Sequence, residues 1–350
     1  MQMAKVPYSK PALNYADQIS QLKARHLHID DDNKALHLLQ TLSYYRLSGY
    51  WYPMIKEPKY RHLFKDDSKF SNAFKLYCFD RELKQLVMGD VEKIEIAVRA
   101  KMIYIMAMTH GAFWYLDKNL FIDPAAHGKT IKIIEREYKR SDETFIKNFN
   151  AKYSDPFPPS WMILEVISFG TLVKLYDNLL PSPTKLSISA CFGIDEPTFS
   201  SWINSFVSVR NLCAHHARFW NKKMNIHPLV PTTTNHMFIT NFTAPHRIPG
   251  RPNFLNNQRV YFLASVLIYI LNTINPNHSF KEKLHKLLAK YPMIDTKAMG
   301  FPDGWESESL WNWKRVCSNR KWYRRYWRYL KKDILLYFET KRIRNYKPTN

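Results

Sequence analysis

One long stretch of the chain, from residue 71 to about residue 109, is nearly free of helix-breaking residues. Its apolar residues recur at the spacing that places them on one face of an α-helix: Leu76, Phe79, Leu83, Leu86, Val87, Val91, Ile94 and Val98. This pattern predicts one long helix or two stacked helices, with Gly89 as the favoured position for a kink. No other segment constrains the fold as strongly.

Capping residues and prolines predict further helices. An acidic cluster at Asp30, Asp31 and Asp32 is typical of a helix start, and the helix is expected to run through Leu47 and to break at Ser48-Gly49. Pro159 precedes a helix expected over residues 161–180, and Asp195-Glu196-Pro197 begins another. The remaining expected helices are a short one ending at Cys191 and helices over residues 258–272, 280–290 and 321–341.

The composition favours the same class of fold. The chain has only 9 glycines among 350 residues, and no segment alternates convincingly as a strand would. We therefore predict an all-α protein, a helical bundle with a basic, aromatic helical C-terminal extension. The expected division is a helical core over residues 1–225, an irregular linker or crossover over 226–257 rich in Pro, Thr, Asn and His, and a basic helical region over 258–350.

Cysteine usage and hydropathy bear on the compartment. The four cysteines, Cys78, Cys191, Cys213 and Cys317, are widely separated, so the sequence suggests neither a disulfide framework nor a zinc site. The first ten residues have no apolar signal core, and the most hydrophobic stretch, residues 260–271, is too short to span a bilayer. We expect a cytoplasmic protein without a membrane, a metal or a cofactor.

The net charge points to a polyanionic partner. Lysine and arginine outnumber acidic residues by 52 to 30, which gives +22. Residues 311–350 hold many of the cations, interleaved with tryptophans and tyrosines, as in proteins that pair with phosphates and stack on unpaired bases. An amphipathic helix packed on the core would show a similar pattern. We expect RNA rather than DNA as the partner, with candidate contacts at Arg320, Lys321, Arg324, Arg325 and Arg328.

The sequence R-N-L-C-A-H-H, residues 210–216, carries the side chains that RNA cleavage without a metal requires. Histidine can move protons at neutral pH, arginine can stabilise the extra negative charge on phosphorus, and asparagine can orient the histidine or bind a phosphate oxygen. On a helix, Asn211 and His215 share a face, and the long side chain of Arg210 can reach it. The alternative is an exposed helix end at which His215 caps carbonyls.

Several other residues are secondary candidates. Arg218 and Asn221 follow the motif and are expected to contact RNA, with solvated side chains as the alternative. Glu165 lies among apolar residues and is expected to pair with an arginine of the motif helix, either to hold the fold or to support catalysis. Arg46 stays open between packing and RNA contact. Asp80, Arg81 and Glu82 are expected to form a salt-bridged helix surface.

Four segments in a fixed order resemble one known family: Y-Y-R-L-S-G-Y-W-Y-P at 44–53, L-Y-C-F-D-R-E-L at 76–83, W-M-I-L-E-V-I-S-F-G-T-L-V-K-L-Y at 161–176 and S-W-I-N-S-F-V-S-V-R-N-L-C-A-H-H-A-R-F-W-N at 201–221. Together they resemble the bacterial abortive-infection Abi family, of the AbiD and AbiF type, within the HEPN superfamily of helical ribonucleases. The superfamily hallmark R-N-x-x-x-H falls on Arg210, Asn211 and His215. His216 also satisfies a looser form of the hallmark.

The resemblance implies phage defence by a metal-independent endoribonuclease whose products end in a 2′,3′-cyclic phosphate. It also implies a homodimer that forms a composite active site, and a structured small RNA as inhibitor or guide. The alternative function is a non-catalytic protein whose helical core and basic tail hold a structured RNA. A third hypothesis is a protein-binding switch whose helical core docks another effector. This hypothesis does not explain the net charge of the chain.

Overall fold

The computed structural model describes residues 7–235, 237–244 and 251–312. The described chain is mainly helical, which confirms the all-α prediction. The helices are α1 (Tyr15–Ala24), α2 (Asp32–Leu42), α3 (Tyr44–Trp51), α4 (Phe70–His110), α5 (Pro124–Arg140), α6 (Thr144–Lys152), α7 (Ser160–Val166), α8 (Phe169–Asp177), α9 (Pro183–Ala190), α10 (Glu196–Ala214), α11 (Val260–Ile274) and α12 (Phe280–Lys290).

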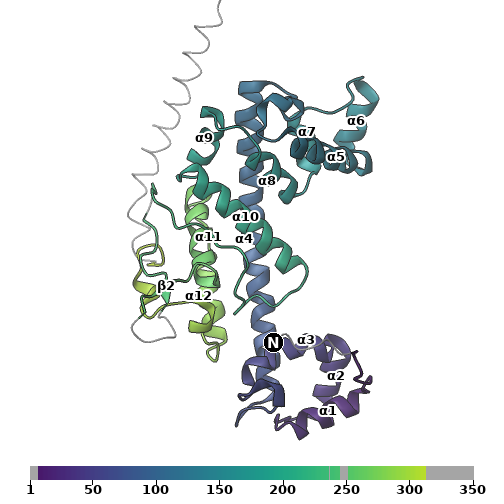
Figure 1. The fold of residues 1–350 in the computed structure, drawn as a ribbon, viewed down its shortest axis with the longest axis vertical. Helices are drawn as coiled ribbons and strands as arrows, with labels where there is room; N and C mark the ends of the chain where they lie inside the picture. The colour runs from purple at the N-terminus through teal and green to yellow at the C-terminus, as the bar shows by residue number, and fades with distance from the viewer. Residues whose placement is uncertain (1–6, 236, 245–250, 313–350) are drawn as a thin grey trace, which may run out of the picture.

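Helix α4 is the central support of the molecule (Figure 1). It has 41 residues and is therefore about 60 Å long. The predicted apolar residues are buried except Leu86, which is half-buried, and α3, α7, α9, α10, α11 and α12 all pack against α4. The long segment thus forms one continuous helix, and Gly89 lies inside it.

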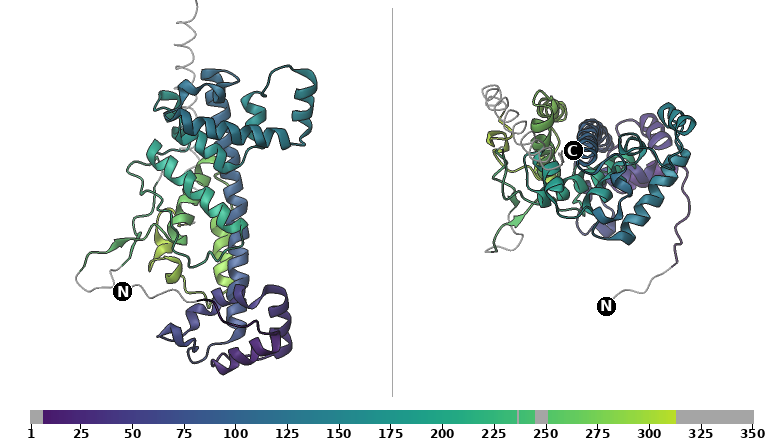
Figure 2. Two further views of the ribbon diagram at one scale, coloured as in Figure 1. Left: turned by 45° about the vertical axis from the view of Figure 1, so that its right-hand side comes forward. Right: turned by 90° about the horizontal axis from the view of Figure 1, so that it is seen from above.

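The two ends of α4 carry separate groups of helices (Figure 1). Helices α1 to α3 lie at its N-terminal end, and α5 to α9 lie towards its C-terminal end. Figure 2 shows from two further directions that α10, α11 and α12 lie alongside the middle of α4. The helix that contains the R-N-x-x-x-H sequence therefore crosses the molecule between the two end groups.

Two predictions of where a helix ends are wrong. The chain turns at Ser43 rather than at Ser48-Gly49, because Ser43 adopts a φ of 64° and its hydroxyl accepts the backbone N–H of Arg46, which begins α3. The helix expected over residues 161–180 is two helices. Ile167 is extended, and the Ser168 hydroxyl caps α8 by accepting the backbone N–H of Thr171 (3.2 Å).

The buried core continues across residue 225. The described part of residues 226–257 holds no helix and contributes two short antiparallel strands, β1 (Thr243–Ala244) and β2 (Phe254–Leu255). Helix α11 then returns to α4, and nearly all of its residues are buried in the core that α4 and α10 share. Among the described residues, no helix combines the length and the apolar character that crossing a membrane requires.

Candidate active site at the end of helix α10

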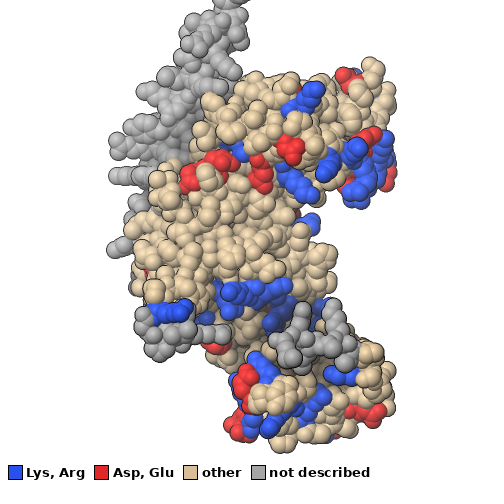
Figure 3. Space-filling model, in the orientation of Figure 1, with Lys and Arg blue, Asp and Glu red and all other residues tan. Residues whose placement is uncertain are grey.

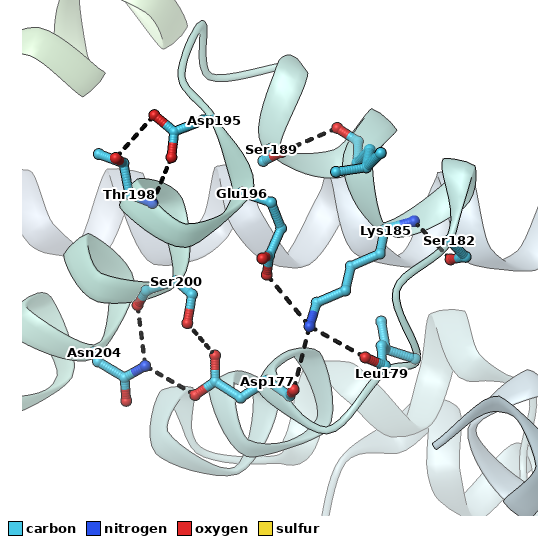
Figure 4. A network of polar contacts seen from close by, with 11 residues as sticks. Asp177, Leu179, Ser182, Lys185, Ser189, Asp195, Glu196, Thr198, Ser200 and Asn204 are labelled. Carbon is cyan, nitrogen blue, oxygen red and sulfur yellow. Dashed lines mark hydrogen bonds and ion pairs between the residues drawn. The ribbon is translucent and has the colours of Figure 1, made fainter. Parts of the chain in front are cut away.

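The N-terminus of α10 is fixed by a capping residue (Figure 4). Asp195 accepts hydrogen bonds from the backbone N–H and from the hydroxyl of Thr198, both at 2.9 Å. These bonds satisfy a backbone donor that the first turn of a helix leaves free. Pro197 follows in the first turn, where its missing N–H is not needed.

Side chains from α8 and α9 also hold this end of α10 (Figure 4). Buried Lys185 pairs with Glu196 (3.3 Å) and donates to the carbonyls of Asp177 and Leu179. The Asp177 carboxylate accepts from Ser200 and Asn204 of α10. The start of the motif helix therefore has a defined position relative to α8 and α9.

The C-terminus of α10 closes with a Schellman motif. His216 has a φ of 55° and donates its backbone N–H to the Cys213 carbonyl, while Ala217 donates to the Leu212 carbonyl. His215 is the last residue before this turn, and its N–H still reaches the Asn211 carbonyl (3.0 Å). The two adjacent histidines thus differ in backbone conformation, since only His216 is left-handed.

The three motif side chains lie on the surface at this helix end. Arg210, Asn211 and His215 are exposed, and the Arg210 guanidinium donates to the Asn211 side-chain oxygen at 3.4 Å. Asn211 and His215 are one helical turn apart on the same face. The structure therefore brings the candidate catalytic residues together, with His216 exposed beside them.

A buried carboxylate on α4 fixes the chain that leaves the motif. Asp80 is 0% exposed and accepts the backbone N–H groups of Phe219 (3.0 Å) and Trp220 (2.7 Å). It also accepts the hydroxyl of Tyr50 (2.7 Å) and pairs with Lys84 (3.1 Å). Burial and the Asp80 charge raise the pKa of Tyr50, which keeps that hydroxyl a donor.

The expectation that Asp80 belongs to a helix surface is wrong. Neighbouring Glu82 does pair at the surface, with Lys290 (2.8 Å). Asp80 falls instead on the apolar stripe with Leu76 and Leu83, and Lys84 follows it on the same face. A carboxylate and an ammonium four residues apart on an apolar helix face are the signal that identifies this buried pair.

Two arginines considered as candidate RNA contacts bind backbone carbonyls around the turn that follows α10. Arg46 donates to the His216 carbonyl (3.0 Å), and Arg218 donates to the Gly49 carbonyl. These bonds join the motif turn to α3. Lys84 joins the same turn to α4 by donating to the Ala217 carbonyl (3.2 Å). The Arg46 side chain is nevertheless exposed, whereas Arg218 is half-buried.

The structure contradicts the expected partner of Glu165 and shows the surroundings of Asn221. Glu165 is 51% exposed and lies 3.9 Å from Arg99 of α4, so the expected pairing with an arginine of the motif helix is wrong. In Figure 1 its helix, α7, lies beside α5, whereas α10 ends lower along α4. The Asn221 carbonyl accepts from Arg259, and the Asn221 side-chain oxygen is buried without a hydrogen-bond partner among the described residues.

Basic side chains gather around the hollow on this side of the molecule. Figure 3 shows the hollow between the end group formed by α5 to α7 and the end group formed by α1 to α3, with Lys and Arg at both of its edges. Helix α10 ends within this hollow (Figure 1). Arg320, Lys321, Arg324, Arg325 and Arg328 lie outside the described residues. Among the described residues, no group of His, Cys, Asp and Glu is arranged to hold a metal ion.

Comparison with known proteins identifies one family. The family described as Abi-like protein matches residues 37–221, which span α3 to α10 and include Asp80 and the whole motif. No curated protein and no solved structure matches the chain significantly.

Proposed function

The chain belongs to the family of Abi-like proteins, and on this basis we propose that it is a metal-independent endoribonuclease acting in phage defence by abortive infection. Membership of the family supports the defence role. The cleavage chemistry is supported by one observation above all. Arg210, Asn211 and His215 are exposed together at a helix end whose position is fixed by buried contacts.

The proposed reaction is an internal transesterification. His215 takes the proton of a ribose 2′-hydroxyl, whose oxygen attacks the adjacent phosphorus. The bond to the 5′-oxygen breaks, and that oxygen leaves with a proton. The products are a 2′,3′-cyclic phosphate and a 5′-hydroxyl. The Arg210 guanidinium stabilises the additional negative charge on phosphorus, and Asn211 orients His215 or donates to a phosphate oxygen.

A second copy of the chain is proposed to complete the site. One motif supplies one histidine, His215, on the same helix face as Asn211. The reaction, however, removes a proton from the 2′-oxygen and adds one to the 5′-oxygen. The exposed end of α10 is accessible to the same surface of another copy across a two-fold axis. The resulting composite site would contain two arginines and two His215 side chains.

The test is RNA cleavage in EDTA by protein that has been stripped of copurifying RNA. We expect His215→Ala to lower the cleavage rate by about 10²- to 10⁴-fold, because a positioned proton-transfer group contributes that much. The matched control is His216→Asn, since asparagine tolerates the left-handed conformation that this position requires. Cleavage by the control should stay close to wild type and leave cyclic-phosphate ends.

Two outcomes would contradict this assignment. Equal cleavage by wild type and His215→Ala would place the chemistry elsewhere, and loss of cleavage only in the His216 variant would identify His216 as the base. Tight RNA binding without cleavage by any of the proteins would favour the alternative, a non-catalytic RNA-binding protein.

A structured small RNA is the proposed partner, held by the basic surface and by the C-terminal cations. Replacing Arg324, Arg325 and Arg328 together should weaken RNA binding and flatten its dependence on salt, because each lost phosphate contact removes about one unit from the salt slope. The rate of cleavage at saturating RNA should stay unchanged. An unchanged salt slope would show that these arginines do not contact phosphates.

A further inference from the structure

A cavity of about 270 Å³ opens beside the motif helix. It is bounded by one face of α10, by the segment that follows the motif, and by α11. The side chains used in the argument are Ser208, Val209 and Leu212 of α10 and Lys222, Asn225 and Ile226 of the following segment. Neither the proposed reaction nor the contacts at the motif assign this cavity a role.

The cavity and His215, the proposed general base of the reaction, lie along the same face of α10. Ser208, Leu212 and His215 are separated by four and three residues, which places them on the same face of α10. Along the helix axis, Leu212 and Ser208 precede His215 by about 5 and 10 Å. A nucleotide seated in the cavity therefore has phosphates within reach of His215.

The chemistry of the walls suits a nucleobase. Val209, Leu212 and Ile226 are apolar and can cover the faces of a flat ring, whereas the Ser208 hydroxyl and the Asn225 amide can hydrogen-bond to its edges. An apolar cavity of roughly 150 Å³ is enough to bind benzene. At about 270 Å³, this cavity therefore has room for the ring system of a pyrimidine or a purine.

The outer wall of the cavity, which contains Asn225 and Ile226, is held by hydrogen bonds before and after these two residues. Met224 donates its backbone N–H to the Gln258 carbonyl (3.0 Å). On the other side, Asn257 donates to the Pro228 carbonyl (2.9 Å), and Leu229 exchanges hydrogen bonds with Ser201 and Trp202 of α10. The cavity is therefore present before a ligand binds, which lowers the entropy lost on binding.

We infer that this cavity receives one nucleobase of a bound RNA chain, next to the phosphodiester presented to His215. The inference rests on the proposed function and adds a subsite to it. The base enters between Leu212 and Ile226, its edges contact Ser208 and Asn225, and the Lys222 ammonium pairs with a phosphate of the same strand. The subsite fixes which phosphodiester lies at the motif.

The test measures RNA affinity in a His215→Ala background, in which the RNA stays intact. The probes are short single-stranded RNAs of one mixed sequence, each with one abasic position. We expect one abasic position to weaken binding about tenfold. Adding Ser208→Leu, which fills the cavity from the helix wall, should weaken binding of the intact RNA about tenfold and remove the effect of that abasic position.

Two control variants keep the test decisive. Ser187→Leu makes the same change at an exposed serine of α9 outside the cavity, and it should leave every affinity and the abasic penalty unchanged. Asn225→Ala alters an exposed loop residue without adding volume, and it should reduce the penalty even if Ser208→Leu fails to fold. An equal abasic penalty with and without the cavity variants would overturn the inference.

The outcomes separate this inference from the proposed function. Cleavage by wild type with no effect of the cavity variants would sustain the nuclease and reject the subsite. An abasic penalty at one RNA position that Ser208→Leu removes, without RNA cleavage by wild type, would sustain the subsite and reject the nuclease. A mixture of the four nucleoside monophosphates is added as competitor. Tight binding of a free mononucleotide without an abasic effect on RNA would reject the RNA subsite.

Discussion

His278 is held as a neutral imidazole by its two hydrogen bonds. Its Nδ1 accepts the backbone N–H of Phe280 (3.3 Å), so the proton lies on Nε2, which donates to the Asn272 side-chain oxygen (2.9 Å). Burial, together with Lys281 and Lys93, lowers the pKa of His278 to about 4. An unfolded chain binds this proton near pH 6.5, so folding stability falls as pH drops from about 6.5 towards 4.

We therefore expect wild type to lose about 2 kcal/mol more stability than His278→Gln between pH 7 and pH 5. Urea unfolding of both proteins at the two pH values measures the difference. Carboxylates that titrate in this range act equally on both proteins and cancel in the comparison. Parallel pH dependence of the two proteins would show that His278 is protonated in the folded state.

Asp80 permits a second prediction on single residues. Asp80→Asn leaves buried Lys84 without its counter-ion and should lower the free energy of unfolding by about 3 kcal/mol. Adding Lys84→Met should recover part of this loss, because no buried charge then remains unpaired. The control is Glu82→Gln on the same helix, which breaks a more exposed pair and should cost less than about 1 kcal/mol. Equal losses in Asp80→Asn and Glu82→Gln, measured in urea at pH 7, would contradict the buried role.

At the scale of the elements, α10 ends at a turn in which His216 adopts a backbone conformation that histidine does not favour. His216 has a positive φ, in which a side chain strains the backbone and glycine does not. His216→Gly should therefore raise the free energy of unfolding by up to about 1 kcal/mol, and His216→Val should lower it by about 1–2 kcal/mol. Thermal or urea unfolding of the two variants measures these changes. A higher free energy of unfolding for His216→Val than for His216→Gly would exclude the Schellman turn.

At the scale of the whole molecule, the prediction concerns association. If two motif ends must meet, the cleavage rate per chain should fall on dilution below the dimerisation range, so that activity decreases faster than concentration. Cleavage assays over a dilution series, with the mass of the particle measured in parallel, test this expectation. Strict proportionality between rate and concentration would show that a single chain holds the complete site.

Local signals made the main elements predictable. The apolar spacing of α4 lies within that helix, and the caps Asp31 and Asp195 immediately precede α2 and α10, so the sequence identifies these helices without tertiary information. The helix breaks at Ser43 and Ile167 are harder to predict, because each following helix begins at a single serine cap inside an otherwise helical pattern. The placement of Arg210, Asn211 and His215 at one helix end is predictable for the same local reason.

The parts of the site that hold the motif were not predictable in this way. The backbone groups bound by Asp80 belong to Phe219 and Trp220, 139 and 140 residues later in the chain. The polar sequence Asp80-Arg81-Glu82 indicates a buried Asp80 only when it is considered together with Lys84 and the apolar face of α4, and it does not indicate which backbone groups Asp80 binds. The cavity lined by Leu212 and Ile226 likewise exists only after α11 has packed behind it.

The central position of α4 has a consequence for synthesis of the chain. Helix α4 ends at His110, whereas α11, which covers part of its apolar face, begins at Val260. At about 5–20 residues per second, a ribosome needs roughly 8–30 s to make the intervening segment. During that interval the apolar face is uncovered and is a natural target for chaperones. A chain released early would lack α11, and with it one wall of the cavity beside the proposed active site.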